Sequence, residues 1–195
     1  QLLLDEFLLK EAFKRDGYWA NKFGHQLGVK YVDALNIKNL DLQLETNFVR
    51  PFTYSHSDSI ANYTHYNQPL AHPLCAGFAE FIGILKYQPA PKWYINARAI
   101  YYYQGLDSAG QNFGSNPFEL YTTRLNNYGY FIGSGDKVKV LNASLAVSYE
   151  LKENLFIEGS YLYRKASALT GINSGNTNLF EIGIRLNAAR REFDY

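Results

Sequence analysis

Residues 137–164 alternate between apolar and polar positions, and this two-residue period is the feature that most limits how the chain can fold. A turn at 151–154 divides the segment, and both halves keep the alternation. The positions on the apolar side are Leu141, Ala143, Leu145, Val147 and Tyr149, then Leu155, Ile157, Gly159, Tyr161 and Tyr163. Because successive side chains of a strand point to opposite sides of a sheet, the pattern predicts a β-hairpin with one apolar and one polar face.

The same period recurs along the rest of the chain, so residues 1–195 are predicted to form one antiparallel all-β domain of about eight strands. Further strands are expected at 23–31, 40–48, 79–87, 93–104 and 179–187. We expect residues 1–6 to be the end of another strand and residues 7–17 to form a helical turn or a loop. A soluble antiparallel sandwich shows the same alternation and is the alternative to a membrane β-barrel.

The distribution of charge favours the barrel. A basic residue that faces lipid at mid-depth costs roughly 2–4 kcal/mol, so a lipid-facing strand surface should carry no charge in its middle. Lys139 and Arg50, which fall outside the polar set, lie near strand ends. The charged residues assigned to the polar face are Lys22, Lys30, Asp41, Glu45, Glu80, Lys86, Arg98, Glu150, Glu158, Arg164, Glu181 and Arg185. Six of these are basic and six are acidic, which is more typical of a filled interior than of a selective pore.

The connections between strands alternate in length. Short turns are expected near residues 37, 90 and 153, and long loops at 54–76, 106–136 and about 165–177. Outer-membrane barrels have short periplasmic turns and longer external loops. With this topology the strand-end aromatic residues form two interfacial girdles, one of Tyr31, Tyr87, Trp93 and Tyr149, the other of Phe23, Phe48, Tyr101, Tyr103, Tyr161 and Tyr163.

Composition excludes several other classes. No stretch approaches the roughly 20 apolar residues of a membrane helix. The formal net charge of +1 gives no basis for binding nucleic acid. A single cysteine, Cys75, excludes an internal disulfide framework and a multi-cysteine metal site. The chain has no methionine, shows no signal peptide and begins in mid-pattern, so we expect it to be a mature or partial piece of a longer product.

The loop at 54–76 holds the candidate binding residues, because it contains three of the four histidines together with tyrosines and amides. Flat aromatic rings suit the faces of sugars, and polar side-chain tips suit their hydroxyl groups. The predicted glycan or partner contacts are Tyr63, His65, Tyr66, Asn67 and His72. A metal set of His56, Asp58, His65 and His72 matches no compact ligand motif, so neither a metal nor a cofactor is predicted. The alternative is a loop ordered by its own hydrogen bonds.

Catalytic chemistry is not predicted. The glycine-rich segment 131–136 lacks the strand-to-helix context and the following Lys-Ser/Thr of a phosphate-binding loop. Its glycines are expected to permit turns. No Ser-His-Asp set can be assembled from the sequence, and we expect a protein that is not an enzyme.

Several segments together resemble one protein family. They are 31–34 (Tyr-Val-Asp-Ala), 39–43, 50–56 (Arg-Pro-Phe-Thr-Tyr-Ser-His), 61–74, 104–110 and 127–135. In these segments the chain is similar to the Wzi-like capsule-assembly proteins of Bacteroidetes, which include the gliding-motility protein RemB. Cys75 and Ala76 depart from the glycine-centred form of this stretch.

The resemblance implies a cell outer-membrane β-barrel with more strands than this chain has, of which the chain would be the C-terminal part. It implies attachment or assembly of surface polysaccharide, with outer-membrane lipid, lipopolysaccharide and other outer-membrane proteins as partners. Two alternatives stay open: a subunit of a gliding-motility or protein-secretion complex in the outer membrane, and a passive porin.

Overall fold

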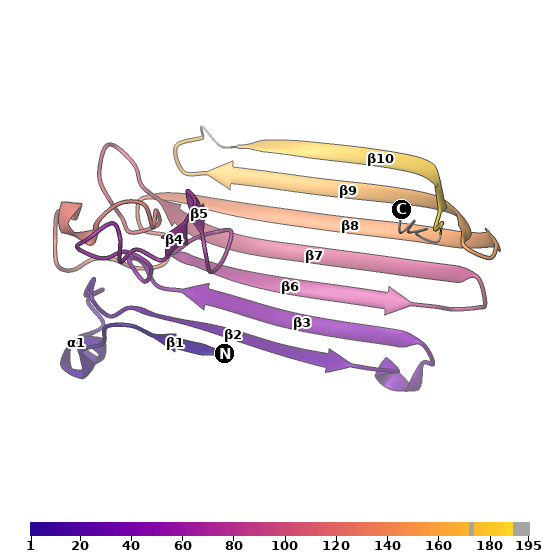
Figure 1. Ribbon diagram of the computed structural model, residues 1–195, viewed down its shortest axis with the longest axis horizontal. Helices are drawn as coiled ribbons and strands as arrows, with labels where there is room; N and C mark the ends of the chain where they lie inside the picture. The colour runs from indigo at the N-terminus through magenta and orange to yellow at the C-terminus, as the bar shows by residue number, and fades with distance from the viewer. Residues whose placement is uncertain (172–173, 189–195) are drawn as a thin grey trace, which may run out of the picture.

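The computed structural model describes residues 1–171 and 174–188, in which eight strands form one antiparallel sheet of order β1-β2-β3-β6-β7-β8-β9-β10 (Figure 1). The strands are β1 (Leu2–Leu4), β2 (Phe23–Tyr31), β3 (Leu40–Val49), β6 (Phe78–Tyr87), β7 (Trp93–Leu106), β8 (Asp136–Lys152), β9 (Leu155–Ala168) and β10 (Gly175–Leu186). The predicted all-β class is confirmed. The two edges, β1 and β10, do not pair with each other in the described residues, so the sheet is open.

The remaining elements are short. The segment 7–17 contains a helix, α1 (Leu9–Lys14), and the loop between β3 and β6 contains a small hairpin of β4 (Thr64–His65) and β5 (Gln68–Pro69). One-turn 3-10 helices occur at Ala34–Asn36 and Tyr121–Thr123. Within the described residues, no helix has the length and apolar character needed to cross a membrane.

The long connections gather at one end of the sheet, which we call the loop end, together with α1 (Figure 1). The short turns lie at the opposite end. The predicted connection at 165–177 is shorter than expected, because β9 continues to Ala168 and β10 already begins at Gly175, which pairs with Ala166. Residues 172–173, and the tail 189–195 of the predicted domain, lie outside the described part of the chain.

The pairing register places the predicted apolar set on a single face. Residues directly opposite each other in an antiparallel pair point to the same side of the sheet. Leu145 lies opposite Ala97 on β7 and Tyr161 on β9, and Tyr161 lies opposite Phe180 on β10. The polar set is aligned in the same way, since Glu158 lies opposite Ser148 and Gly183. A one-residue slip anywhere would mix the faces, so this register preserves the alternation across the sheet.

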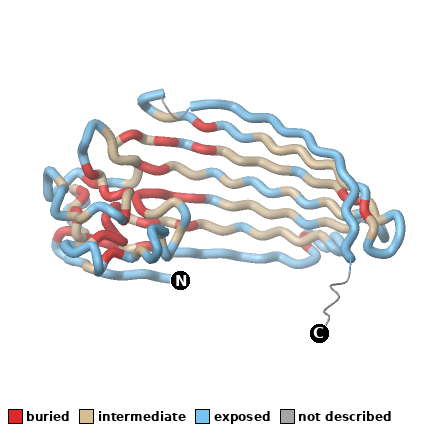
Figure 2. Tube along the Cα trace, turned by 45° about the horizontal axis from the view of Figure 1, so that its top comes forward, coloured by how far each residue is buried: buried red, intermediate tan, exposed pale blue. Residues whose placement is uncertain are grey.

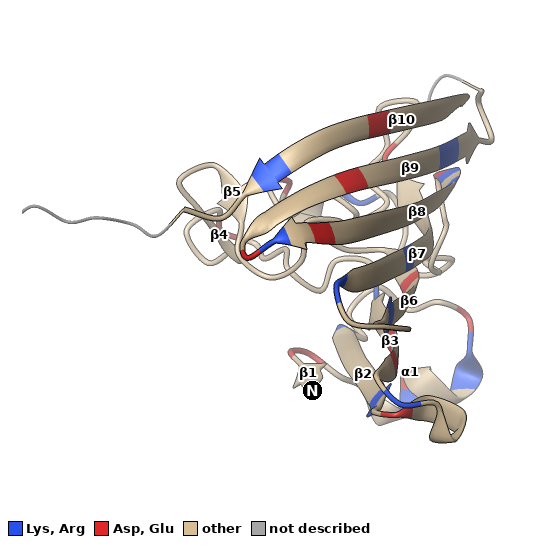
Figure 3. Cartoon of the chain, turned by 90° about the vertical axis from the view of Figure 1, so that its right-hand side faces the viewer, with Lys and Arg blue, Asp and Glu red and all other residues tan. Residues whose placement is uncertain are grey.

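Figure 3 looks along the strands and shows that the sheet curls, with the β4–β5 hairpin on its concave side. The loop carrying this hairpin contacts the polar face, where His72 Nε2 lies 3.1 Å from the Glu80 carboxylate. The polar faces of β7 to β10 also line a hollow of about 630 Å³. The polar face is therefore the inner one and the apolar face the outer one.

Buried residues are concentrated at the loop end (Figure 2). In the described residues the buried apolar side chains form clusters of Val49, Tyr54, Ala76 and Phe78; of Trp19, Phe52 and Tyr130; and of Val138, Val140 and Ala166. The outer face along the strands is open instead, with Leu44 63% and Ile182 90% exposed. No second sheet covers it within residues 1–171 and 174–188.

Candidate functional site

Lys22, just before β2, organises the loop end. Its side chain is fully buried, and its Nζ donates a hydrogen bond of 3.0 Å to the Ser55 carbonyl. The ammonium also lies 3.2 Å from the Glu6 carboxylate, 3.5 Å from that of Asp5, and 4.5 Å from the centre of the Tyr121 ring. One cation therefore joins the N-terminal segment, β2 and both long loops, because a buried charge is stable only when it is paired and hydrogen-bonded.

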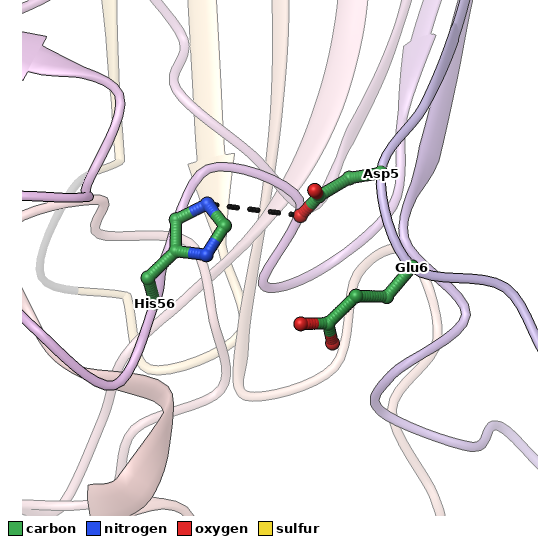
Figure 4. Close-up of side chains that lie close together, drawn as sticks. All are labelled: Asp5, Glu6 and His56. Atoms are coloured by element: carbon green, nitrogen blue, oxygen red, sulfur yellow. Dashed lines mark ion pairs between the residues drawn. The ribbon is translucent and has the colours of Figure 1, made fainter.

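Asp5, Glu6 and His56 form a group of possible metal ligands beside this lysine (Figure 4). One ligand atom from each of the three lies within 4.8 Å of the others, and His56 Nε2 is 3.7 Å from Asp5 Oδ2. The Lys22 ammonium pairs with both carboxylates and balances one of their two charges. The group therefore works as an ion-pair network. The metal set considered from the sequence was His56, Asp58, His65 and His72, and the structure does not bring these residues together. Of the four, only His56 belongs to a group of possible metal ligands in the described residues.

A groove of about 710 Å³ lies on the polar face at the loop end, between β1, β2 and the loop joining β3 to β6; we call it the β1 groove. Two of the five predicted contact residues, Tyr63 and His72, line it. Other lining residues include Leu3, Asp5, Gln26, Tyr54 and His56. This size lies in the ordinary range of small-ligand sites.

Tyr63 presents a flat ring to the groove. Its ring stacks on that of Tyr54 with the centroids 5.8 Å apart and an interplanar angle of 28°, and its backbone N–H donates to the Tyr54 carbonyl. The Tyr63 side chain is half exposed, whereas Tyr54 is buried. Burial raises the pKa of the Tyr54 phenol, which keeps it protonated at neutral pH. The pair therefore offers a supported aromatic surface.

His72 is held by bonds to its ring nitrogens. Nδ1 accepts a hydrogen bond of 3.2 Å from the Leu74 N–H, so Nε2 carries the proton that is donated to Glu80. Glu80 also accepts from Asn47 Nδ2 at 2.7 Å, and the imidazole stacks on Phe78 with centroids 4.5 Å apart. Both ring nitrogens are occupied, so His72 lines the groove with its ring and has no free nitrogen for a ligand.

The other three predicted contacts lie elsewhere. His65, Tyr66 and Asn67 form the tip of the β4–β5 hairpin. Tyr66 and Asn67 have φ values of 46° and 59°, the left-handed pair required by a two-residue type I′ turn. Tyr66 is 89% exposed, and the His65 ring lies 4.3 Å from its ring. The structure thus divides the predicted set into a groove pair and a hairpin-tip trio.

Sequence reasoning missed Asp5, Gln26 and His56 as residues lining one groove with Tyr63. The alternation of β2 already placed Gln26 on the polar face, which is a usable signal. Nothing local to residues 1–6 could show that Asp5 lies beside His56, because that contact depends on β1 pairing with β2.

The chain has no significant match among protein-family models, curated proteins or solved structures. The resemblance to Wzi-like proteins therefore stays a prediction. The function has to be inferred from the two-faced sheet and the loop end.

Proposed function

We propose that this chain is a segment of an outer-membrane β-barrel that is not an enzyme and that helps to attach or assemble surface polysaccharide. The observation that carries the proposal is the uncovered apolar face, which runs from β2 to β10 on the outer side of a curled sheet. Phe180, Ile182 and Ile184 are 75%, 90% and 74% exposed. Contact with lipid would remove this apolar surface from water, at roughly 25 cal/mol per Å².

The open edges support a place within a larger barrel. In the described residues the outer edge of β10 is unpaired over twelve residues. The N-terminal segment covers β2 only along its first four residues, where Leu2–Leu4 pair with Phe23–His25 and Gln1 pairs with Gln26. Backbone groups cannot be left unpaired in a bilayer, so membrane sheets close into barrels. We infer that further strands pair with both edges, with this chain as the C-terminal segment of the barrel.

The loop end is the proposed external surface. It carries the long connections, the Lys22 network and the β1 groove, whereas the opposite end has only short turns. Binding residues commonly lie on loops held by a rigid scaffold. Lipid and lipopolysaccharide would surround the apolar face below these loops, and the polysaccharide would lie above it.

The test is polysaccharide retention in cells of the source organism. Cells that lack the gene should release surface polysaccharide into the medium, and wild-type protein should restore retention. A double variant, Tyr63→Ala with Tyr66→Ala, should restore barrel abundance in the outer membrane but not retention. Full retention in the deletion strain would contradict the proposed function.

A second role, as a subunit of a gliding-motility or secretion complex, is favoured by apolar side chains exposed on the loops. Ile60 is 90% exposed and Leu125 is 65% exposed, and neither lies on the outer face of the sheet. Exposed apolar side chains mark protein contacts where they gather into a patch. Purification from native membranes should then recover stoichiometric outer-membrane partners, and an Ile60→Ser, Leu125→Ser variant should lose them.

A further inference from the structure

We propose that the β1 groove is a binding site for uncharged sugar units and that it excludes acidic ones. This inference rests on the proposed function and adds to it the chemical class of the ligand. It also means that the groove pair, Tyr63 and His72, contacts the ligand and that the residues at the hairpin tip do not.

The shape and rings of the groove fit a sugar. Tyr63 and His72 both line it, and each ring is backed by a second ring, that of Tyr54 or Phe78. A stacked ring is fixed in orientation, so it loses little conformational freedom when a ligand packs against it. The C–H face of a pyranose is flat and apolar, which matches such a surface. At about 710 Å³ the groove has room for more than one sugar unit.

Free polar groups lie beside these rings. Within the described residues, the Gln26 amide, the Tyr63 hydroxyl and the His56 ring line the groove and make no side-chain hydrogen bond, although His56 lies 3.7 Å from Asp5. An amide, a phenol and an imidazole each donate and accept hydrogen bonds. Sugar hydroxyl groups do the same, so these side chains can pair with them in either direction.

The charges lining the groove determine which sugars fit. Among the described residues that line the groove, Asp5 is the one that carries a carboxylate, and none is a lysine or an arginine. The Lys22 ammonium beside Asp5 is fully buried and already contacts Asp5 and Glu6. Carboxylates and phosphates are normally held by Arg or Lys. An acidic sugar would meet the Asp5 carboxylate with no lysine or arginine side chain in the groove to bind its own negative charge, which selects against that class.

The experiment measures binding of the full-length protein in detergent to surface polysaccharide from the source cells. Anion-exchange chromatography separates this polysaccharide into uncharged and acidic fractions. Wild-type protein should bind the uncharged fraction at least about tenfold more tightly. Tyr63→Ala should weaken that binding about tenfold, the effect of removing one aromatic contact. Tyr66→Ala, at the exposed hairpin tip, should leave it within about twofold and is the matched control.

A gain-of-binding variant keeps the test independent of folding losses. Gln26→Lys places a cation in the groove and should increase binding of the acidic fraction. Preference of the wild type for the acidic fraction, or equal losses in Tyr63→Ala and Tyr66→Ala, would overturn the groove assignment while leaving the proposed function in place. Failure of the wild type to bind either fraction, together with full retention in the deletion strain, would overturn both.

Discussion

The loop end and the strand body of this molecule are stabilised in different ways. At the loop end, Phe52 and Phe78 are fully buried and Lys22 joins four segments through paired charges. Along the strands Phe180 is 75% exposed, and the apolar face has no cover within the described residues. The first region holds itself together by its own packing. In the second, backbone hydrogen bonds join neighbouring strands, and the apolar face is left open.

The glycines show the same contrast. A Cβ added at Gly105, near the loop end of β7, would collide with the backbone of Gly133 and Ser134. A Cβ added at Gly159, in the middle of β9, would meet nothing within 4 Å. The backbone is therefore close-packed at the loop end and open in the strand body, the arrangement that the proposed lipid-facing sheet with a loop cap would have.

The largest expected effect comes from a charge on the outer face. Leu145→Arg places a guanidinium in the middle of that face, at a cost of roughly 2–4 kcal/mol in lipid. Ser144→Arg, one residue away, points to the polar face and should be milder. The measurement is barrel insertion into membranes after expression of each variant. Equal effects of the two substitutions would contradict the assignment of the faces.

The next effect tests the loop end. Lys22→Met keeps the apolar stem but removes the ammonium, and it should destabilise the loops by about 3 kcal/mol. This value is at the low end for breaking a buried ion pair, because the Asp5 and Glu6 carboxylates keep some contact with water. Lys30→Met breaks a half-exposed pair with Asp41 and should cost about 0–1 kcal/mol.

Hydrogen exchange of the loop amides at 50–77 and 107–135 reads out the effect of Lys22→Met. The exchange should quicken there and not along β8 and β9, since local opening is governed by local packing. Uniform quickening over the whole sheet would show that the two regions are not independent.

The sequence predicted the strands and their faces because both depend on local alternation. Seven strands were expected within a few residues of their observed bounds, and the register keeps every predicted outward residue from Leu27 to Ile184 on one side. The turns were also local, marked by proline at Pro89 and Pro91 and by Asn154, which has a φ of 63°.

The site was predicted less well because its parts come together over long sequence separations. Lys22 was placed correctly on the polar face, but its burial depends on Asp5, Ser55 and Tyr121, which no local pattern relates to it. The loop at 54–76 was identified as a whole, yet its five candidates divide between the groove and the hairpin tip. Neither alternation nor composition could show which ring packs on Tyr54.

The smallest effect comes from the two glycines. Gly105→Ala should destabilise the protein by about 1–3 kcal/mol, the range for overpacking against a backbone that cannot move. Gly159→Ala should be neutral or stabilise by up to about 0.5 kcal/mol, because alanine loses less freedom in a strand. Thermal unfolding in detergent measures both. Similar losses at the two positions would mean that the strand body is packed as closely as the loop end.

The central claim, that the apolar face meets lipid and the polar face meets water, is tested most directly by spin labels along β8. Single cysteines at positions 141–149 would be labelled in a Cys75→Gly background, which suits the φ of 60° at that position. Collision with dissolved oxygen reports lipid contact, and collision with a water-soluble nickel chelate reports water. We expect oxygen to dominate at 141, 143, 145, 147 and 149 and nickel at the positions between them. A profile without a two-residue period, or with nickel dominating at Leu145 in membranes, would contradict the claim.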